Sequence, residues 1–256
     1  MLHVFYTKDK TPHYEIIDGG CANINIKVGI NAPRLLRIYV RDPSAANREQ
    51  KLAQKLIDKI PIPQIYQIKE KFGYTFAIAE FSPGITLRDF LLHNKAPHIG
   101  QIMFEVDVML NSISSMKFDK SGLLNNDLQI TKTITQEDYI DFLKSTLMDD
   151  YVVSILSESE RHQIDRIIVL YGHLLPDAEE KNLVHVDFDP SNILVEDVNG
   201  RMEISGILDW EFSFSGSTLC DVANMLRYKD YMPPEYEDAF LKGLSSKGFV
   251  CLKIGV

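Results

Sequence analysis

The first third of the chain alternates between apolar and polar residues, the pattern of half-buried strands. The strands that it predicts are residues 23–28, 34–40, 64–69 and 74–81. Residues 46–60 interrupt this alternation with apolar residues at helical spacing, namely Leu52, Leu56, Ile57 and Ile60, which predicts a helix with one buried face. The N-terminal region is therefore predicted to be a small antiparallel sheet accompanied by one helix.

From residue 86 onward, apolar residues mostly recur every three or four positions, which predicts helices. The predicted helices are residues 86–93, 100–116, 137–156, 157–175, 222–228 and 233–244. Ser157 and Glu160 have the spacing of a capping box, which opens the fourth of these helices. The apolar stripe of that helix is Ile164, Ile167, Ile168, Tyr171 and Leu175. We expect these helices to pack as a floor beneath the loop and hairpin that interrupt them.

A hairpin is predicted between the fourth and fifth helices. Residues 193–195 and 203–208 are β-prone, and the dipeptide Asn199-Gly200 between them best tolerates the positive φ angles of a tight turn. Because a hairpin folds its ends together, Asn192 and Asp209 are expected to finish within a strand rise or two of each other. An amide oxygen and a carboxylate that meet in this way are hard ligands, suited to magnesium.

Asp187 lies one short loop before the hairpin, on the same rim, where its carboxylate can face a substrate hydroxyl. A base, two metal ligands and a turn that assembles them form the layout of a phosphoryl-transfer site. The alternative is that these acids are ordinary solvated loop residues, since a bare His-x-Asp-x-x-x-x-Asn also occurs by chance. The hairpin and the offset of Asp209 favour the functional interpretation. His185 is expected to buttress the loop, Asp221 to accept its backbone N–H groups, and Asp189 to be solvated or, alternatively, a helper acid.

These residues resemble the aminoglycoside phosphotransferase family, which includes choline-kinase-like small-molecule kinases and shares the protein-kinase fold. The motifs that carry the resemblance are His185-Val186-Asp187, Asn192-Ile193-Leu194-Val195 and Ile207-Leu208-Asp209-Trp210-Glu211, continued by Gly216 and Asp221. The family usually has Gly where Val186 stands. The resemblance covers about residues 16–241. It implies an α+β, two-lobed protein-kinase-like fold, with a small antiparallel β-sheet N-lobe and one helix (residues 1–81) and a mainly helical C-lobe (residues 82–256).

The N-terminal region offers candidate contacts for a nucleotide. Gly19 and Gly20 lie between Glu15-Ile16-Ile17 and the predicted strand 23–28. Glycine there lets backbone N–H groups approach phosphates, although paired glycines are also common in plain turns. The family commonly has Gly-x-x-Asn here, and Gly20 to Asn23 matches that pattern. The resemblance also implies that a purine contacts the link between the lobes, at Glu80 and Phe81.

Arg37 is a charge between apolar neighbours in a predicted strand, so it needs a partner or a route to solvent. The functional interpretation is a phosphate-binding cation that pairs with Glu49 of the following helix. Arg34, Arg48 and Glu70 leave other pairings open, and an edge strand would let Arg37 reach solvent.

Composition adds limits rather than a function. The chain has 256 residues, of which 45% are hydrophobic and 25% charged, which is enough for two lobes of a soluble protein. It lacks an apolar run long enough to span a bilayer and a recognisable signal peptide, and its three scattered cysteines suggest reduced thiols in a cytoplasm. The net charge of −9 disfavours nonspecific nucleic-acid binding and fits a cationic substrate, although many enzymes are acidic for solubility alone.

The sequence thus leads to the hypothesis of a magnesium-dependent kinase that uses ATP, with GTP as an alternative, to phosphorylate a hydroxyl of a small molecule. The resemblance and the acidity favour an aminoglycoside-like antibiotic as the acceptor. Choline, another amino-alcohol, homoserine or a sugar are the alternatives. A competing hypothesis is a catalytically weak, nucleotide-binding regulatory relative, because the sequence stops at Val256, where members of the family commonly continue with further helices.

Overall fold

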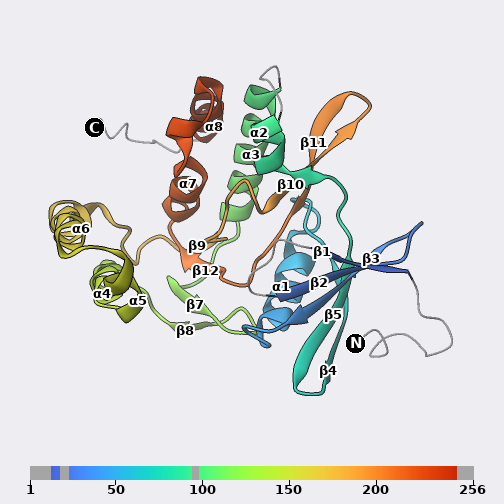
Figure 1. Cartoon of the computed structure of the whole chain (residues 1–256), viewed down its shortest axis with the longest axis horizontal. Helices are drawn as coiled ribbons and strands as arrows, with labels where there is room; N and C mark the ends of the chain where they lie inside the picture. The colour runs from blue at the N-terminus through green and yellow to red at the C-terminus, as the bar shows by residue number, and fades with distance from the viewer. Residues whose placement is uncertain (1–12, 18–22, 94–97, 247–256) are drawn as a thin grey trace.

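A five-stranded antiparallel sheet forms one end of the molecule (Figure 1). The computed structural model describes residues 13–17, 23–93 and 98–246, and every structural statement refers to these residues. In the order β1-β2-β3-β5-β4, the strands are β1 (Tyr14–Ile17), β2 (Asn23–Val28), β3 (Arg34–Tyr39), β5 (Tyr74–Glu80) and β4 (Ile65–Lys71). Ile26, Leu36 and Phe76 share a buried cluster on one face. The period of two therefore leaves Asn23, Arg37 and their neighbours for the opposite face.

Helix α1 (Ala45–Leu56) links this sheet to the rest of the protein. Leu52, Leu56 and Ile60 are buried, as their spacing predicts, and they belong to the same apolar cluster as the helices that follow. The prediction was wrong for Ile57, which is 50% exposed. Ile57 still has helical dihedrals as the C-cap residue, so its side chain is rotated by about 100° around the helix from that of Leu56, away from the buried face.

The largest core lies among the helices of the second region. Helix α3 (Ile99–Ser114) runs alongside α8 (Pro234–Ser246), with α2 (Leu87–His93) and α7 (Leu219–Leu226) nearby (Figure 1). Ile102, Val106 and Leu110 of α3 are fully buried, at the spacing that the sequence predicts. The sheet with α1 and this helical region confirm the predicted α+β class, with a small antiparallel sheet and one helix followed by a mainly helical region. The sheet ends one residue before the lobe boundary expected at residue 81.

Two small sheets position the predicted site. One has the order β11-β10-β6 and the other β8-β7-β12-β9. Their strands are β6 (Ile85–Thr86), β7 (Gly122–Leu124), β8 (Ile130–Lys132), β9 (Asn182–Val184), β10 (Ile193–Val198), β11 (Arg201–Ile207) and β12 (Phe214–Gly216). The predicted loop leaves β9 at His185, and residues 208–213 connect β11 to β12.

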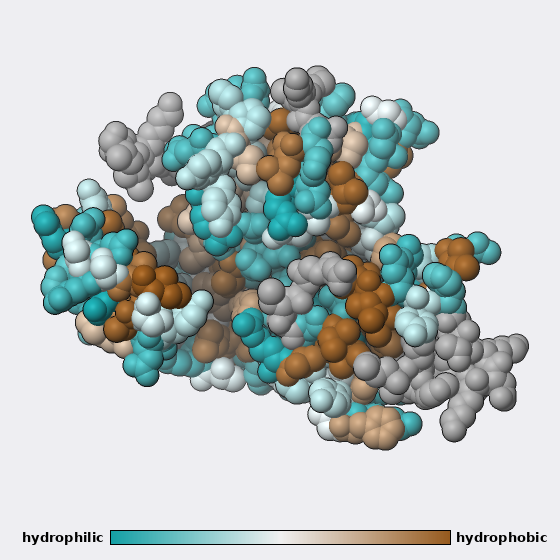
Figure 2. Space-filling model, viewed as in Figure 1, coloured by the Kyte–Doolittle hydropathy of each residue, from teal (hydrophilic) through white to brown (hydrophobic). Residues whose placement is uncertain are grey.

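Three further helices, α4 (Gln136–Leu147), α5 (Asp150–Ile155) and α6 (Glu158–Tyr171), form a separate group. The predicted capping box of Ser157 and Glu160 is present at the start of α6. The expected burial of the α6 stripe was wrong, since Ile168 is buried whereas Ile167 and Tyr171 are each 55% exposed. The reason is that α6 packs mainly on α4 and leaves this side facing solvent. Figure 2 accordingly shows apolar side chains on the surface of this group.

None of the described helices is both long and apolar enough to cross a membrane. Cys220 lies in the described residues and is a free thiol, whereas Cys21 and Cys251 lie outside them.

Candidate functional site

The hairpin of β10 and β11 brings the two predicted metal ligands together. Ile193 pairs with Ile207 at its open end, and the turn residues Asn199 and Gly200 have φ angles of 57° and 84°, as the dipeptide predicts. The Leu208 N–H donates to the Asn192 carbonyl at 2.8 Å, so Asn192 lies opposite the residue that precedes Asp209. Register and turn chemistry thus fix the distance between two positions that are distant along the chain.

Asp187 is joined to Asn192 directly. The Asn192 amide nitrogen donates to the Asp187 carboxylate at 2.8 Å and to the Asp187 carbonyl at 3.0 Å. These bonds fix which way the amide faces, because its nitrogen points toward Asp187 and its oxygen therefore points elsewhere. The oxygen is the atom that can bind a cation. Asp187, Asn192 and Asp209 therefore form one connected group at the open end of the hairpin.

Asp221 holds the loop that carries Asp187. Its two carboxylate oxygens accept the N–H groups of His185 at 2.9 Å and Val186 at 2.8 Å, which is the role expected from the sequence. Burial raises the pKa of Asp221 to about 7, while the two N–H donors act in the opposite direction. The amide of Asn224 donates to the Val186 carbonyl. The loop backbone is therefore fixed from beneath by α7.

Val186 has a left-handed backbone, with φ at 75°. A side chain with a Cβ, and a β-branched one above all, is strained there by about 1–2 kcal/mol. Two hydrogen bonds hold it in place: the Val186 N–H donates to the Asp221 carboxylate, and the Asn224 amide donates to the Val186 carbonyl. This conformation explains why glycine suits the position and how valine is nevertheless accommodated.

His185 buttresses the site, as predicted, and is fully buried. Its Nε2 lies 2.8 Å from the Leu208 carbonyl, and its ring centroid is 4.4 Å from that of Trp210. Burial lowers the pKa of His185 to about 4. The ring is therefore neutral, and its Nε2–H donates to the carbonyl next to Asp209. It joins the loop of Asp187 to the loop of Asp209.

Arg37 lies between two carboxylates. Its guanidinium is 2.6 Å from Asp209 and 3.6 Å from Glu49, so the predicted partner is present but Asp209 is nearer. Burial by itself would lower the pKa of Arg37, but Glu49, Tyr39 and Asp209 raise that pKa by more than burial lowers it. The guanidinium therefore stays charged. Burial raises the pKa of Glu49, which Arg37 and the Tyr39 hydroxyl counteract. Sequence spacing identified the cation but could not show that it contacts the hairpin.

Glu211 is a residue that sequence reasoning did not assign to the site. Carboxylate oxygens of Glu49, Asp209 and Glu211 lie within 4.8 Å of one another. Among the described residues, Glu49 Oε1 and Glu211 Oε1 are buried without a hydrogen-bond partner. Of the three, only Asp209 is not fully buried, so its carboxylate is the one that a divalent cation could reach, and carboxylate oxygen is a ligand that magnesium takes. The signal in the sequence was the Asp-Trp-Glu order, which puts a second acid two residues after Asp209.

The other residues predicted to contact the nucleotide do not belong to the group formed by Asp187, Asn192 and Asp209. Gly19 and Gly20 lie outside the described residues. The Asn23 amide is occupied by protein groups, accepting from Val40 N–H at 3.3 Å and donating to Glu211. Glu80 ends β5, and Phe81 follows it, with the Lys27 ammonium 4.8 Å from the Phe81 ring centroid.

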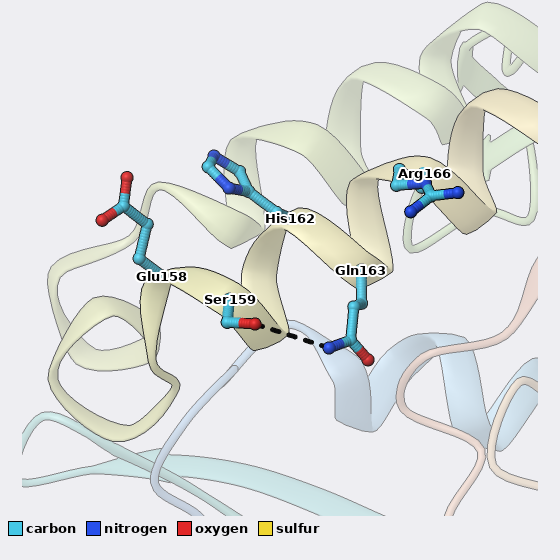
Figure 3. A pocket seen from close by; sticks show the side chains of 5 residues that line it. All are labelled: Glu158, Ser159, His162, Gln163 and Arg166. Atoms are coloured by element: carbon cyan, nitrogen blue, oxygen red, sulfur yellow. Dashed lines mark hydrogen bonds between the residues drawn. The ribbon is translucent and has the colours of Figure 1, made fainter.

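A shallow hollow on α6 lies apart from this group (Figure 3). It is lined by Glu158, Ser159, His162, Gln163 and Arg166, all from one helix, and Gln163 donates to the Ser159 hydroxyl at 3.5 Å. Figure 1 places α6 on the opposite side of the helical region from β10 and β11. The hollow is the solvated polar face of an amphipathic helix and offers no arrangement for catalysis.

Comparisons with known proteins show which family and which folds this chain is similar to. The model of a family described as "Phosphotransferase enzyme family" matches residues 13–250. The GDP and kanamycin complex of APH(2″)-IIia has a TM-score of 0.75 at 18% identity, covering 98% of this chain and 82% of that one. A thermostable mutant of aminoglycoside phosphotransferase APH(4)-Ia, in a ternary complex with ADP and hygromycin B, has a TM-score of 0.70 at 17% identity, covering 92% and 78%. At these identities the likeness concerns the fold.

A curated relative is similar over part of its length. Acyl-CoA dehydrogenase family member 10 of Mus musculus is 27% identical over 201 residues, which cover 75% of this chain. The chain spans only 17% of the length of that relative. The similarity therefore concerns one portion of a much longer protein.

Proposed function

The chain belongs to the phosphotransferase enzyme family, and on that premise we propose that it transfers the γ-phosphate of a purine nucleoside triphosphate to a hydroxyl of a small molecule. The observation that carries this proposal is the connected group at the open end of the hairpin. Asp187 contacts Asn192 at 2.8 Å, and Asp209 contacts Arg37 at 2.6 Å. A base, two oxygen ligands and a partly buried cation are the parts that phosphoryl transfer needs.

Asp187 orients the acceptor hydroxyl and receives its proton as the acceptor oxygen bonds to the γ-phosphorus. The bond between the γ-phosphorus and the β–γ bridging oxygen breaks, and the nucleoside diphosphate leaves. Its hydrogen bond from Asn192 keeps the carboxylate in one orientation. The Asn192 amide oxygen and Asp209 would hold Mg²⁺, which supplies positive charge against the phosphate oxygens. Arg37, braced by Glu49, binds the α- and β-phosphates.

For the nucleotide we propose ATP, with GTP as the alternative. The complexes of related folds with ADP or GDP support a purine nucleotide. The purine would contact the backbone around Glu80 and Phe81. The Glu80 N–H already donates to the Gln64 carbonyl at 2.8 Å, so the carbonyl of Glu80 and the backbone of Phe81 are the groups proposed for the base. Gly19 and Gly20 are proposed to cover the phosphates.

For the acceptor we propose an aminoglycoside-like antibiotic, which would make the protein a cytoplasmic resistance enzyme. The kanamycin and hygromycin B complexes of related folds and the net charge of −9 support a cationic acceptor. Choline, another amino-alcohol, homoserine and a sugar are the alternative acceptors.

The test is magnesium-dependent consumption of ATP and GTP against a panel of aminoglycosides, choline, homoserine and sugars. We expect one acceptor class to stimulate turnover. Asp187→Asn should lower kcat by about 10²–10⁴, the usual contribution of a general base, while nucleotide binding is retained. Asp197→Asn, at the exposed far end of the same hairpin, is the matched control. Wild-type turnover in Asp187→Asn would refute the assignment of the base.

A further inference from the structure

We propose that Glu211 is a positioning residue, which forms with Asn23 a buried latch between β2 and the loop of Asp209. The inference rests on the proposed function, because the loop that the latch holds carries the carboxylate proposed for Mg²⁺. It assigns to Asn23 a role in holding the protein together at the site, in place of the nucleotide contact that the sequence suggested.

The latch consists of two side chains that are far apart in sequence. Glu211 is 3% exposed and its Oε2 accepts from the Asn23 amide nitrogen at 3.0 Å. The amide oxygen of Asn23 accepts the Val40 N–H, just after β3, at 3.3 Å. Both ends of one amide are thus used, and the Glu211 carboxylate is joined to two adjacent strands of the large sheet.

A second connection reaches the same residue from α1. Arg48 is 8% exposed, and its guanidinium donates to the backbone carbonyl of Glu211. Asp42 accepts from the same guanidinium group at 3.2 Å, which fixes the direction of the arginine. Arg41 lies 3.8 Å from Glu211 Oε1, and its guanidinium is 5.4 Å from the ring centroid of Phe212. The short segment that follows Asp209 is therefore held by β2 through Asn23, by α1 through Arg48 and by the β3–α1 loop through Arg41.

Asp209 depends on such support because its backbone is left-handed, with φ at 68°. A residue with a side chain adopts this conformation at a cost and keeps it only where the surroundings determine it. Asp209 lies two residues before Glu211, and its carboxylate is 2.6 Å from Arg37. The latch therefore keeps the carboxylate at the position from which it contacts Arg37.

A latch and a cation ligand require different properties of Glu211. The latch needs an oxygen that accepts from Asn23, whereas a ligand for a cation needs the negative charge. Glutamine keeps an acceptor oxygen of the same reach and removes the charge. Alanine removes both. The two substitutions therefore separate the two roles at one position.

The experiment compares Glu211→Ala, Asn23→Ala, their double variant and Glu211→Gln with the wild type. We expect each alanine variant to lower kcat/KM by roughly ten- to hundredfold, the effect of leaving a buried group without its partner. The kcat/KM of the double variant should lie no more than about threefold below that of either single variant, because the two single substitutions break the same contact. Glu211→Gln should restore kcat/KM to near the wild-type value, with an unchanged Mg²⁺ requirement.

Hydrogen exchange of residues 208–212 in the protein alone gives a readout that needs no turnover. We expect faster exchange in both alanine variants and near-wild-type exchange in Glu211→Gln. If the wild type shows no activity, the proposed function fails while this measurement still tests the latch. If Glu211→Gln is as impaired as Glu211→Ala and needs more Mg²⁺, the latch is overturned, because the result would show that Glu211 acts through its negative charge as a cation ligand. Additive losses in the double variant, or unchanged exchange, would overturn it as well.

Discussion

The buried neutral histidine of the loop makes a pH-dependent contribution to stability that can be isolated by one substitution. His185 is fully buried, and its Nε2–H donates to the Leu208 carbonyl at 2.8 Å. Glutamine reaches as far and carries an N–H₂ donor, but it does not titrate. His185→Gln should therefore keep the hydrogen bond at neutral pH and remove the titration.

The sign and size of this contribution to the free energy of unfolding follow from the pKa of His185. Burial lowers the pKa of His185 from 6.5 to about 4, so the unfolded chain binds a proton between these values and the folded protein does not. The free energy of unfolding that His185 contributes is thus complete above pH 6.5 and is lost as pH falls toward 4. At about 1.36 kcal/mol for each tenfold change in proton affinity, the loss amounts to about 3 kcal/mol.

The assay is urea denaturation of the wild type and His185→Gln at intervals from pH 4 to pH 8. Asp221 titrates in the same range with the opposite sign, because burial raises its pKa from 3.8 to about 7. That contribution is common to both proteins and cancels in the difference between them. We expect the wild type to lose about 3 kcal/mol relative to the variant over this range. If the free energies of unfolding of the two proteins changed in parallel with pH, His185 would not be a buried neutral group.

Two further predictions use pairs of neighbouring or equivalent positions. Ile168→Ala should lower the free energy of unfolding by about 2–4 kcal/mol, whereas Ile167→Ala, on the exposed side of the same helix, should change it by less than about 0.5 kcal/mol, as thermal or urea unfolding will measure; equal losses would show that the exposed stripe is covered in solution. Gly84 and Gly73 both have positive φ, but an added Cβ at Gly84 would lie 2.3 Å from the Val195 carbonyl oxygen, whereas nothing lies within 4 Å at Gly73. Gly73→Ala should therefore lower the free energy of unfolding by about 1–2 kcal/mol, and Gly84→Ala should lower it by at least about 1–3 kcal/mol more. Similar unfolding midpoints for the two variants would contradict the close approach of Gly84 to the Val195 carbonyl.

The local elements of the fold were predictable because their causes are local. Four strands of the large sheet, β2, β3, β4 and β5, were predicted from the strand pattern, and the capping box of Ser157 and Glu160 from its spacing. The turn at Asn199-Gly200 was enough to predict that Asn192 and Asp209 end near each other. The β-bulge between Leu194 and Val195, which shifts the register so that Asn192 lies opposite Leu208, was not predictable from the turn. What failed was the burial of the α6 stripe, because an apolar face shows only that a helix can be covered and not what covers it.

The sequence by itself determined most of the helices and strands, the hairpin and which residues are candidates for phosphoryl transfer, because propensity, turn chemistry and spacing operate over a few residues. It did not show that the helix predicted over residues 137–156 is divided into α4 and α5. Only the tertiary structure decided which partners those residues have. Arg37 contacts Asp209 more closely than the predicted Glu49, and the Asn23 amide is occupied by Glu211. Such contacts join side chains far apart in the chain, and their distances depend on how the large sheet, α1 and the hairpin pack together. No local pattern encodes that packing.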